Sequence, residues 1–261
     1  MNFETILFDI DSAVLTITLN RPDSYNACNE QLTTDLRGAL KEAETNREVR
    51  AIVLTGAGKA FCSGQDLKEA PEPGAKRSLA DSLVRRYNPI IRKLRTIPKP
   101  VITAINGVAA GAGCSLALAG DIRLMSESAS LIQAFVNIGL VPDSGSSHFL
   151  SHTVGYAKAF EIATLGEKIT ADHAHALGLV NRVVPAENLM AETMSLAARY
   201  AQGPTKAYGY IKKMLQKAEH TSLDDALEYE VFMQEAAGRT YDYGEGVKAF
   251  VEKRKAEFRG E

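Results

Sequence analysis

Cysteine and tryptophan are scarce in this 261-residue sequence, which has three cysteines and no tryptophan. An odd number of cysteines, spread over positions 28, 62 and 114, argues against a disulfide framework and indicates a reducing compartment. An excess of basic charge is also missing, because the formal net charge is -2. Nucleic-acid-binding proteins usually carry such an excess. We therefore expect a cytoplasmic protein that has no nucleic-acid partner.

Long hydrophobic runs are absent as well. The longest apolar stretch, residues 101–118, is interrupted by Asn106 and by glycines, so it does not predict a membrane-spanning helix. The first residues lack the basic flank and apolar run of a signal peptide. What is present is an ordinary balance of 45% apolar and 24% charged residues. This composition predicts one large globular domain, with room for a small appendage, and no membrane partner.

Hydrophobic periodicity divides the chain into two regions. Strands are expected at residues 13–20, 51–54, 101–106 and 121–125, and helices between them at 29–44, 82–95 and 111–120. From residue 154 onward the pattern is helical, with helices expected at 186–201, 205–218, 223–237 and 243–255. No clear sequence repeat is present. The pattern predicts an α/β fold, which we divide into a core of residues 1–200 and a helical region of residues 201–261.

Two glycine-containing segments could present backbone N–H groups to a ligand. In residues 60–67 (AFCSGQDL), a glycine permits a sharp bend after a strand, although an ordinary turn has the same composition. In residues 106–117 (NGVAAGAGCSLA), a small-residue loop enters a helix whose free amides would favour a negatively charged oxygen. Close packing of small residues explains this segment equally well. Leu116 replaces the third glycine of a dinucleotide-binding fingerprint, so that function is not expected.

Asp143 is a candidate acid in a largely apolar stretch of the sequence. It follows the uncharged segment 139–142 (GLVP). An aspartate in this position could serve as a helix N-cap. It could also be a carboxylate in an apolar cleft, where a raised pKa suits a general base. The two roles are compatible, and the sequence leaves both open.

Histidines and arginines give weaker signals. His148 and His152 are four residues apart and could share a helix face, but no cysteine or carboxylate is evident to join them. For that reason we predict no metal site, and His220 is expected separately at a helix end. Basic residues between positions 85 and 95 share one helical stretch, which indicates either a solvated face or contact with the phosphates of a charged cofactor arm.

Taken in order along the chain, the motifs resemble those of the crotonase (enoyl-CoA hydratase/isomerase) superfamily. The resemblance covers nearly the whole chain and depends on residues 19–22 with Asn26, 61–67, 99–107, 120–122, 176–180 and 245–250. It implies a crotonase-like spiral of ββα repeats with a helical C-terminal trimerisation region. It also implies a homotrimer, or a hexamer formed as a dimer of trimers.

The resemblance further implies an acyl-CoA thioester as the substrate, with coenzyme A as part of that substrate and no separate cofactor. The backbone N–H groups of Gln65 and Ala112, with Gly113 as a neighbouring candidate, would form an oxyanion hole for the thioester oxygen. Family positions that would contact the substrate are Ser63, Gly64, Asp66, Leu67, Ser115 and Phe135.

Departures from the family pattern favour one reaction over another. Ser115 and Phe135 occupy the positions where hydratases carry two water-activating glutamates. Asp143 matches the catalytic aspartate of isomerase-type members, and its surroundings resemble the branch that rearranges ring-epoxide CoA esters in phenylacetate degradation. The resemblance therefore implies an enoyl-CoA isomerase with Asp143 as its base. Alternatives are a hydratase with an altered water site, thioester hydrolysis or dehalogenation with Asp143 as nucleophile, and a non-catalytic acyl-CoA-binding protein.

Overall fold

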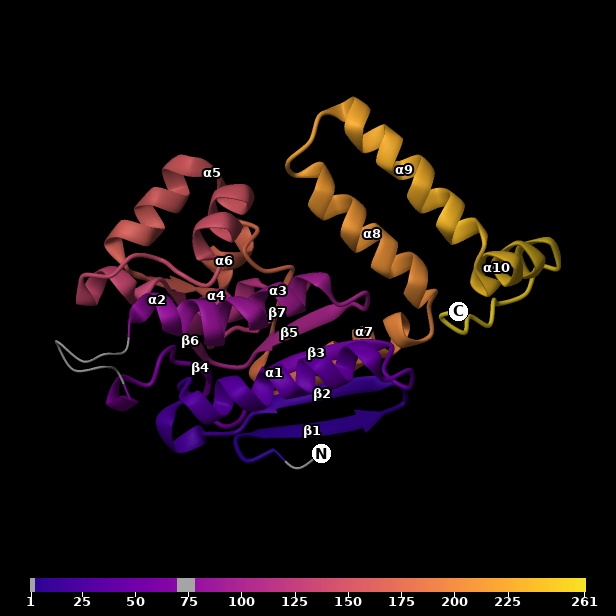
Figure 1. Ribbon diagram of the computed structural model, residues 1–261. Coiled ribbons are helices and arrows are strands. Elements are labelled where there is room, and N and C mark those ends of the chain that lie inside the picture. Colours follow the sequence, from indigo (N-terminus) through magenta and orange to yellow (C-terminus); the bar gives the residue numbers. More distant parts are fainter. Residues whose placement is uncertain (1–2, 70–77) are drawn as a thin grey trace.

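The computed structural model describes residues 3–69 and 78–261, which form two β-sheets, covering helices and a projecting helical region (Figure 1). The larger sheet contains, in spatial order, β1 (Ile6–Asp11), β2 (Val14–Leu19), β3 (Ala51–Gly56), β5 (Val101–Ile105), β7 (Ile122–Ser126) and β10 (Arg182–Val184). The smaller sheet contains β4 (Ala60–Cys62), β6 (Val108–Ala110), β8 (Ser130–Ile132) and β9 (Lys168–Thr170).

Consecutive strands divide between the two sheets in a regular way. In each of the pairs β3/β4, β5/β6 and β7/β8, the first strand joins the larger sheet and the second joins the smaller one. Neighbouring strands of these pairs are parallel in both sheets. The chain therefore forms the predicted spiral of β-strand pairs. The same strand-pairing pattern recurs along the chain, although the sequence has no clear repeat. This is possible because a buried strand requires only apolar or small side chains and not a particular sequence.

Helices cover the sheets and form the C-terminal region. The α-helices are α1 (Glu30–Thr45), α2 (Leu79–Ser82), α3 (Asn88–Thr96), α4 (Ala112–Leu118), α5 (Ser146–Leu165), α6 (Ala171–Ala176), α7 (Leu189–Ala201), α8 (Thr205–Ala218), α9 (Leu223–Gly238) and α10 (Tyr241–Val251). Short 3₁₀ segments are η1 (Pro22–Ser24), η2 (Leu67–Glu69), η4 (Ala134–Ile138) and η5 (Ala186–Asn188), and η3 (Leu83–Tyr87) is a π-helical turn. The α/β fold with a helical C-terminal region is confirmed.

Three expectations about local structure are wrong in detail. Strands β9 and β10 lie in the region that we predicted to be helical throughout, because three-residue strands are too short to show a two-residue period. The helix expected at 82–95 is interrupted by the π-helical turn η3, and Pro89 lies in the first turn of α3. The last helix ends at Val251 instead of residue 255.

The central strands β3 and β5 of the larger sheet are buried on both faces. On one face, Leu15, Ile17 and Leu19 of β2 pack in the same cluster as Leu32 and Leu36 of α1. On the other face, alternate residues of the sheet pack against the apolar side of α7. The alternation of side chains along each strand assigns successive residues to opposite faces. Two-sided burial of the central strands makes this sheet a rigid base from which the connecting loops extend.

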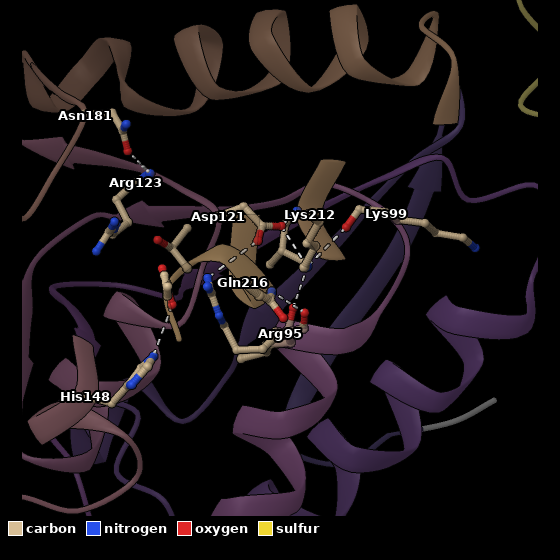
Figure 2. A network of polar contacts seen from close by, with 12 residues as sticks. Arg95, Lys99, Asp121, Arg123, His148, Asn181, Lys212 and Gln216 are labelled. Atoms are coloured by element: carbon tan, nitrogen blue, oxygen red, sulfur yellow. Dashed lines mark hydrogen bonds and ion pairs between the residues drawn. The ribbon is translucent and has the colours of Figure 1, made fainter. Parts of the chain in front are cut away.

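Helix α8 is attached to the larger sheet by a partly buried charge pair (Figure 2). The ammonium group of Lys212 lies 2.8 Å from Asp121 Oδ2 and donates a 2.7 Å hydrogen bond to the carbonyl of Leu94. Asp121 Oδ2 also accepts a 2.9 Å hydrogen bond from the N–H of Val101 at the start of β5. Beyond this attachment, α9 and α10 extend away from the body (Figure 1). In the described part of the chain, no helix combines the length and the apolar character that crossing a bilayer requires.

Candidate active site

The first glycine segment forms a bend that frees the N–H of Gln65. Gly64 has a φ of +95°, which L side chains rarely adopt, and it turns the chain just after β4. Beyond the bend, two backbone hydrogen bonds join the loop to Cys28. The N–H of Cys28 donates to the carbonyl of Gly64 at 2.7 Å, and the backbone N–H of Asp66 donates to the carbonyl of Cys28 at 3.1 Å. Cys28 and Gln65 are thus paired as a parallel bridge. In this pattern the N–H of Gln65 points away from Cys28.

The second segment brings the N-terminus of α4 against this bend. Ala112 and Gly113 are the first two residues of α4, so their N–H groups precede the hydrogen bonds of its first turn. A Cβ atom on Gly64 would lie only 3.5 Å from the amide nitrogen of Ala112. A Cβ atom on Gly113 would lie 2.1 Å from the carbonyl oxygen of Cys62, which makes glycine obligatory there. The structure therefore brings together the two loops that carry the predicted amide donors.

Asp143 lies on a turn directly before α5. Ser144 and Gly145 follow it with φ values of +51° and +85°. A positive φ is uncommon for serine, and such strained residues cluster at functional sites. The carboxyl group of Asp143 accepts a 2.8 Å hydrogen bond from the Ser144 hydroxyl. Burial raises the pKa of the Asp143 carboxyl, although this hydrogen bond opposes the shift. A raised pKa suits a carboxylate that exchanges protons near neutral pH.

Ser115 connects α4 to the turn that carries Asp143. Its hydroxyl is completely buried and lies 3.0 Å from the backbone carbonyl oxygen of Asp143 and 2.7 Å from the hydroxyl of Ser146. The Gln133 side-chain amide donates to the same Ser146 hydroxyl at 3.1 Å. Ser115 therefore supports the backbone of Asp143 from inside the protein.

The other predicted contact residues occupy different environments. Phe135 is buried, and its ring lies 3.9 Å from the position of a Cβ atom on Gly111, so it packs behind the start of α4. Ser63 and Leu67 are exposed. Asp66 is buried and forms a 2.9 Å ion pair with Arg21, which holds the first loop in shape.

Tyr87 contributes a polar group whose role the sequence did not reveal. It ends the π-helical turn η3 and is 6% exposed, and its hydroxyl has no hydrogen-bond partner in the described residues. Burial raises the pKa of this phenol, and the charge of Asp143 is among the smaller contributions in the same direction. Buried hydroxyl groups are normally hydrogen-bonded, so an unpaired one beside a site is available to a ligand. π-Helical turns occur often at functional sites, but nothing in the local sequence predicts one here.

The spiral of strand pairs with its attached helical region defines the chain as a protein of the crotonase fold. It has a TM-score of 0.92 and 36% identity with the crystal structure of an enoyl-CoA hydratase subunit I from Geobacillus kaustophilus HTA426, covering 99% of both chains. The chain belongs to the enoyl-CoA hydratase/isomerase family, whose model matches residues 9–261.

Two similar proteins carry different activities in their names. The 1,2-epoxyphenylacetyl-CoA isomerase of Escherichia coli K12 is 42% identical, covering 98% of this chain and 99% of that protein. A protein of Rhodobacter capsulatus named "Probable enoyl-CoA hydratase" is 40% identical over the full length of both chains. Similarity therefore establishes the family and leaves the choice between isomerase and hydratase to the chemistry of the site.

Proposed function

We propose that the protein is an acyl-CoA isomerase, which shifts a double bond or rearranges a ring epoxide in an enoyl-CoA thioester. One observation carries the proposal: Asp143 is a half-buried carboxyl with a raised pKa, linked through Ser115 to the helix that begins with Ala112. Ser115 and Phe135 cannot hold a water molecule between two carboxylates, because neither side chain carries a carboxylate. The similarity to the Escherichia coli isomerase supports the same reaction class.

The proposed reaction is a proton transfer by a single base. The Asp143 carboxylate removes an acidified proton from a substrate carbon, and the electron pair moves onto the thioester oxygen through a new C=C bond. The N–H groups of Gln65 and Ala112 stabilise this enolate more than the ground-state carbonyl, which lowers the barrier. The protonated carboxyl then returns the proton to a different carbon, and the double bond moves. Substrate and product have the same composition, so no co-reactant is needed.

A ring-epoxide substrate would use the same donors. Their hydrogen bonds to the thioester oxygen withdraw electrons from the adjacent carbon and thereby favour rearrangement of the neighbouring ring. We propose that the buried hydroxyl of Tyr87 donates a hydrogen bond to the acyl group, because it has no partner in the described residues. A place in phenylacetate or other aromatic degradation follows from this substrate class.

Mass spectrometry distinguishes isomerisation from hydration directly. The purified protein is incubated with a panel of enoyl-CoA and ring-epoxide CoA esters, and the products are identified by mass and ultraviolet spectrum. Isomerisation leaves the mass unchanged, whereas hydration adds one water. With a substrate deuterated at the abstracted position, a single base returns part of the label to the product. Accumulation of hydrated product alone, such as 3-hydroxybutyryl-CoA from crotonyl-CoA, would reject the proposal.

We also propose that the chain assembles as a homotrimer, alone or paired into a hexamer. Helix α9 has no buried residue, and Phe232 and Phe250 of the helical region are 68% and 85% exposed. Apolar surface of this kind commonly marks a subunit interface. Sedimentation of the native chain and of Phe232→Asp tests this, with Thr34→Asp on the exposed side of α1 as a control. A native monomer, or an unchanged assembly in Phe232→Asp, would count against this interface.

A further inference from the structure

Four side chains that could bind a metal ion lie together on the surface. They come from the first turns of α5 and from the end of α8, and we call them the histidine cluster: His148, His152, Glu219 and His220. One potential ligand atom from each lies within 4.8 Å of all the others. The imidazole ring centroids are 4.2 to 5.4 Å apart. Figure 2 shows His148 at the edge of the polar network around α8.

The cluster has the donor chemistry of a transition-metal site. Neutral imidazole nitrogens together with one carboxylate are typical ligands of zinc and of neighbouring divalent metals. Tetrahedral zinc needs ligand atoms closer together than 4.8 Å, but three of the four side chains are exposed and can rotate inward. The cluster contributes one negative charge, so a bound divalent ion would be partly neutralised. Two of these side chains already lie close together, with His148 Nε2 at 3.6 Å from Glu219 Oε2.

One histidine is held in an orientation suited to metal binding. The Nδ1 atom of His152 lies 2.8 Å from the carbonyl oxygen of His148. A carbonyl oxygen only accepts, so this contact places the proton on Nδ1 and leaves the Nε2 lone pair free. Metal-binding histidines usually donate their second ring nitrogen to a carbonyl or carboxylate in this way.

We propose that the histidine cluster binds one divalent transition-metal ion, with zinc as the representative member. Four protein ligands would fill a tetrahedral shell, so the ion would have a structural role and no open position for substrate. It would join two elements that are distant in sequence: the start of α5, close behind Asp143, and the end of α8. The ion would thereby fasten the helical region to the part of the core that carries the Asp143 turn.

The proposal reverses our expectation from the sequence. We expected no carboxylate to join His148 and His152, and this is wrong because Glu219 lies beside them. The reason is tertiary: Lys212 docks α8 on the larger sheet, and this brings the end of that helix to α5. A separation of 67 residues between His152 and Glu219 conceals the cluster in the sequence.

Zinc binding to the untagged full-length protein tests the proposal. After chelator treatment and dialysis, the native chain should bind one zinc per chain and should melt at a higher temperature with zinc than without it. The X-ray absorption spectrum should show four nitrogen or oxygen ligands at roughly 2.0–2.1 Å. Less than one zinc per chain under saturating conditions would overturn the proposal.

Matched variants locate the ion. His220→Ala and Glu219→Gln each remove one exposed ligand. We expect zinc affinity to fall at least about tenfold, because mutation of residues that only hydrogen-bond to metal ligands already lowers affinity by this factor. His173→Ala, which removes an exposed histidine of α6, should bind zinc like the native chain. Circular dichroism confirms that each variant is folded, and His152→Ala provides a further ligand variant. Unchanged binding in all ligand variants, or equal loss in His173→Ala, would contradict the site.

Discussion

The hydroxyl of Ser115 lies 3.0 Å from the backbone carbonyl oxygen of Asp143, so the helix that offers amide donors also supports the turn that carries the acid. The two residues are 28 positions apart in sequence and belong to different units of the spiral. The family resemblance places a hydratase glutamate at the position of Ser115. Here a small buried hydroxyl stands there and contacts the turn of another acidic residue. In the reaction that we propose, the proton-transfer group is therefore Asp143, and α4 keeps its role as a source of amide donors.

Replacement of Asp143 by Asn should strongly slow isomerisation while leaving the fold intact. Asparagine keeps the shape and an oxygen acceptor for the Ser144 hydroxyl but cannot take a proton. We expect kcat to fall by ~10²–10⁴-fold, the usual contribution of a general base. Steady-state kinetics with a substrate that the native enzyme isomerises provide the measurement, and Asp9→Asn on the exposed side of β1 is the control. A variant that retained the native rate would rule out Asp143 as the base.

The same carboxyl should give activity a dependence on pH. Burial raises the pKa of Asp143, so the carboxylate needed as a base is lost at a higher pH than for an exposed aspartate. The kcat/KM of the native enzyme should therefore fall on the acid side, with a midpoint above the usual value of ~3.9. If the midpoint of the fall in kcat/KM lay at or below the usual aspartate pKa, a residue other than Asp143 would be the base.

The raised pKa also predicts an effect on stability. The folded state binds the Asp143 proton more tightly than the unfolded state does, so this group stabilises the fold fully below its unfolded pKa. That stabilisation is lost as the pH rises through the folded pKa. Asp143→Asn should therefore raise the melting temperature relative to the native protein near pH 7, and this advantage should shrink toward acid pH. Thermal unfolding of both proteins across this range measures the difference.

The proposed donor at Ala112 can be removed selectively. Ala112 is the first residue of α4, where proline is well tolerated because its missing N–H has no partner within the helix. Ala112→Pro should lower kcat by ~10²–10³-fold, the usual effect of losing one oxyanion donor. Ala112→Gly keeps the N–H and should retain most activity. Equal kinetics for the two variants, with both shown to be folded by thermal unfolding, would remove Ala112 from the oxyanion hole.

Loss of the Ser115 hydroxyl should affect both stability and rate. Ser115→Ala deletes the contacts with Asp143 and Ser146, and we expect the free energy of unfolding to fall by about 0.5–1.5 kcal/mol. The less constrained turn should lower kcat by roughly tenfold, equivalent to about 1.4 kcal/mol of barrier, with little change in KM. Ser147→Ala, on an exposed position of α5, should change neither quantity. A native kcat in Ser115→Ala would limit its role to packing.

Much of this protein was determined by local sequence pattern. The apolar alternation of β2 and the four-residue spacing of leucines in α1 predicted those elements, because both contribute apolar side chains to one buried cluster. The glycines at positions 64 and 113 marked the two donor loops, since only glycine fits their backbone and close contacts. Ordered motifs along the chain predicted the family. These features depend on neighbours in sequence, so the sequence alone could reveal them.

Other properties were decided only by the tertiary structure. The bond from Ser115 to the Asp143 turn, the unpaired hydroxyl of Tyr87 and the meeting of His152 with Glu219 all join elements that are distant in sequence. No local periodicity encodes such pairs, because their distances depend on how strands distribute between two sheets and on where α8 docks. The raised pKa of Asp143 belongs to the same group, since burial by the whole fold causes it. Sequence pattern specified the parts of the site, and packing set their environment and chemistry.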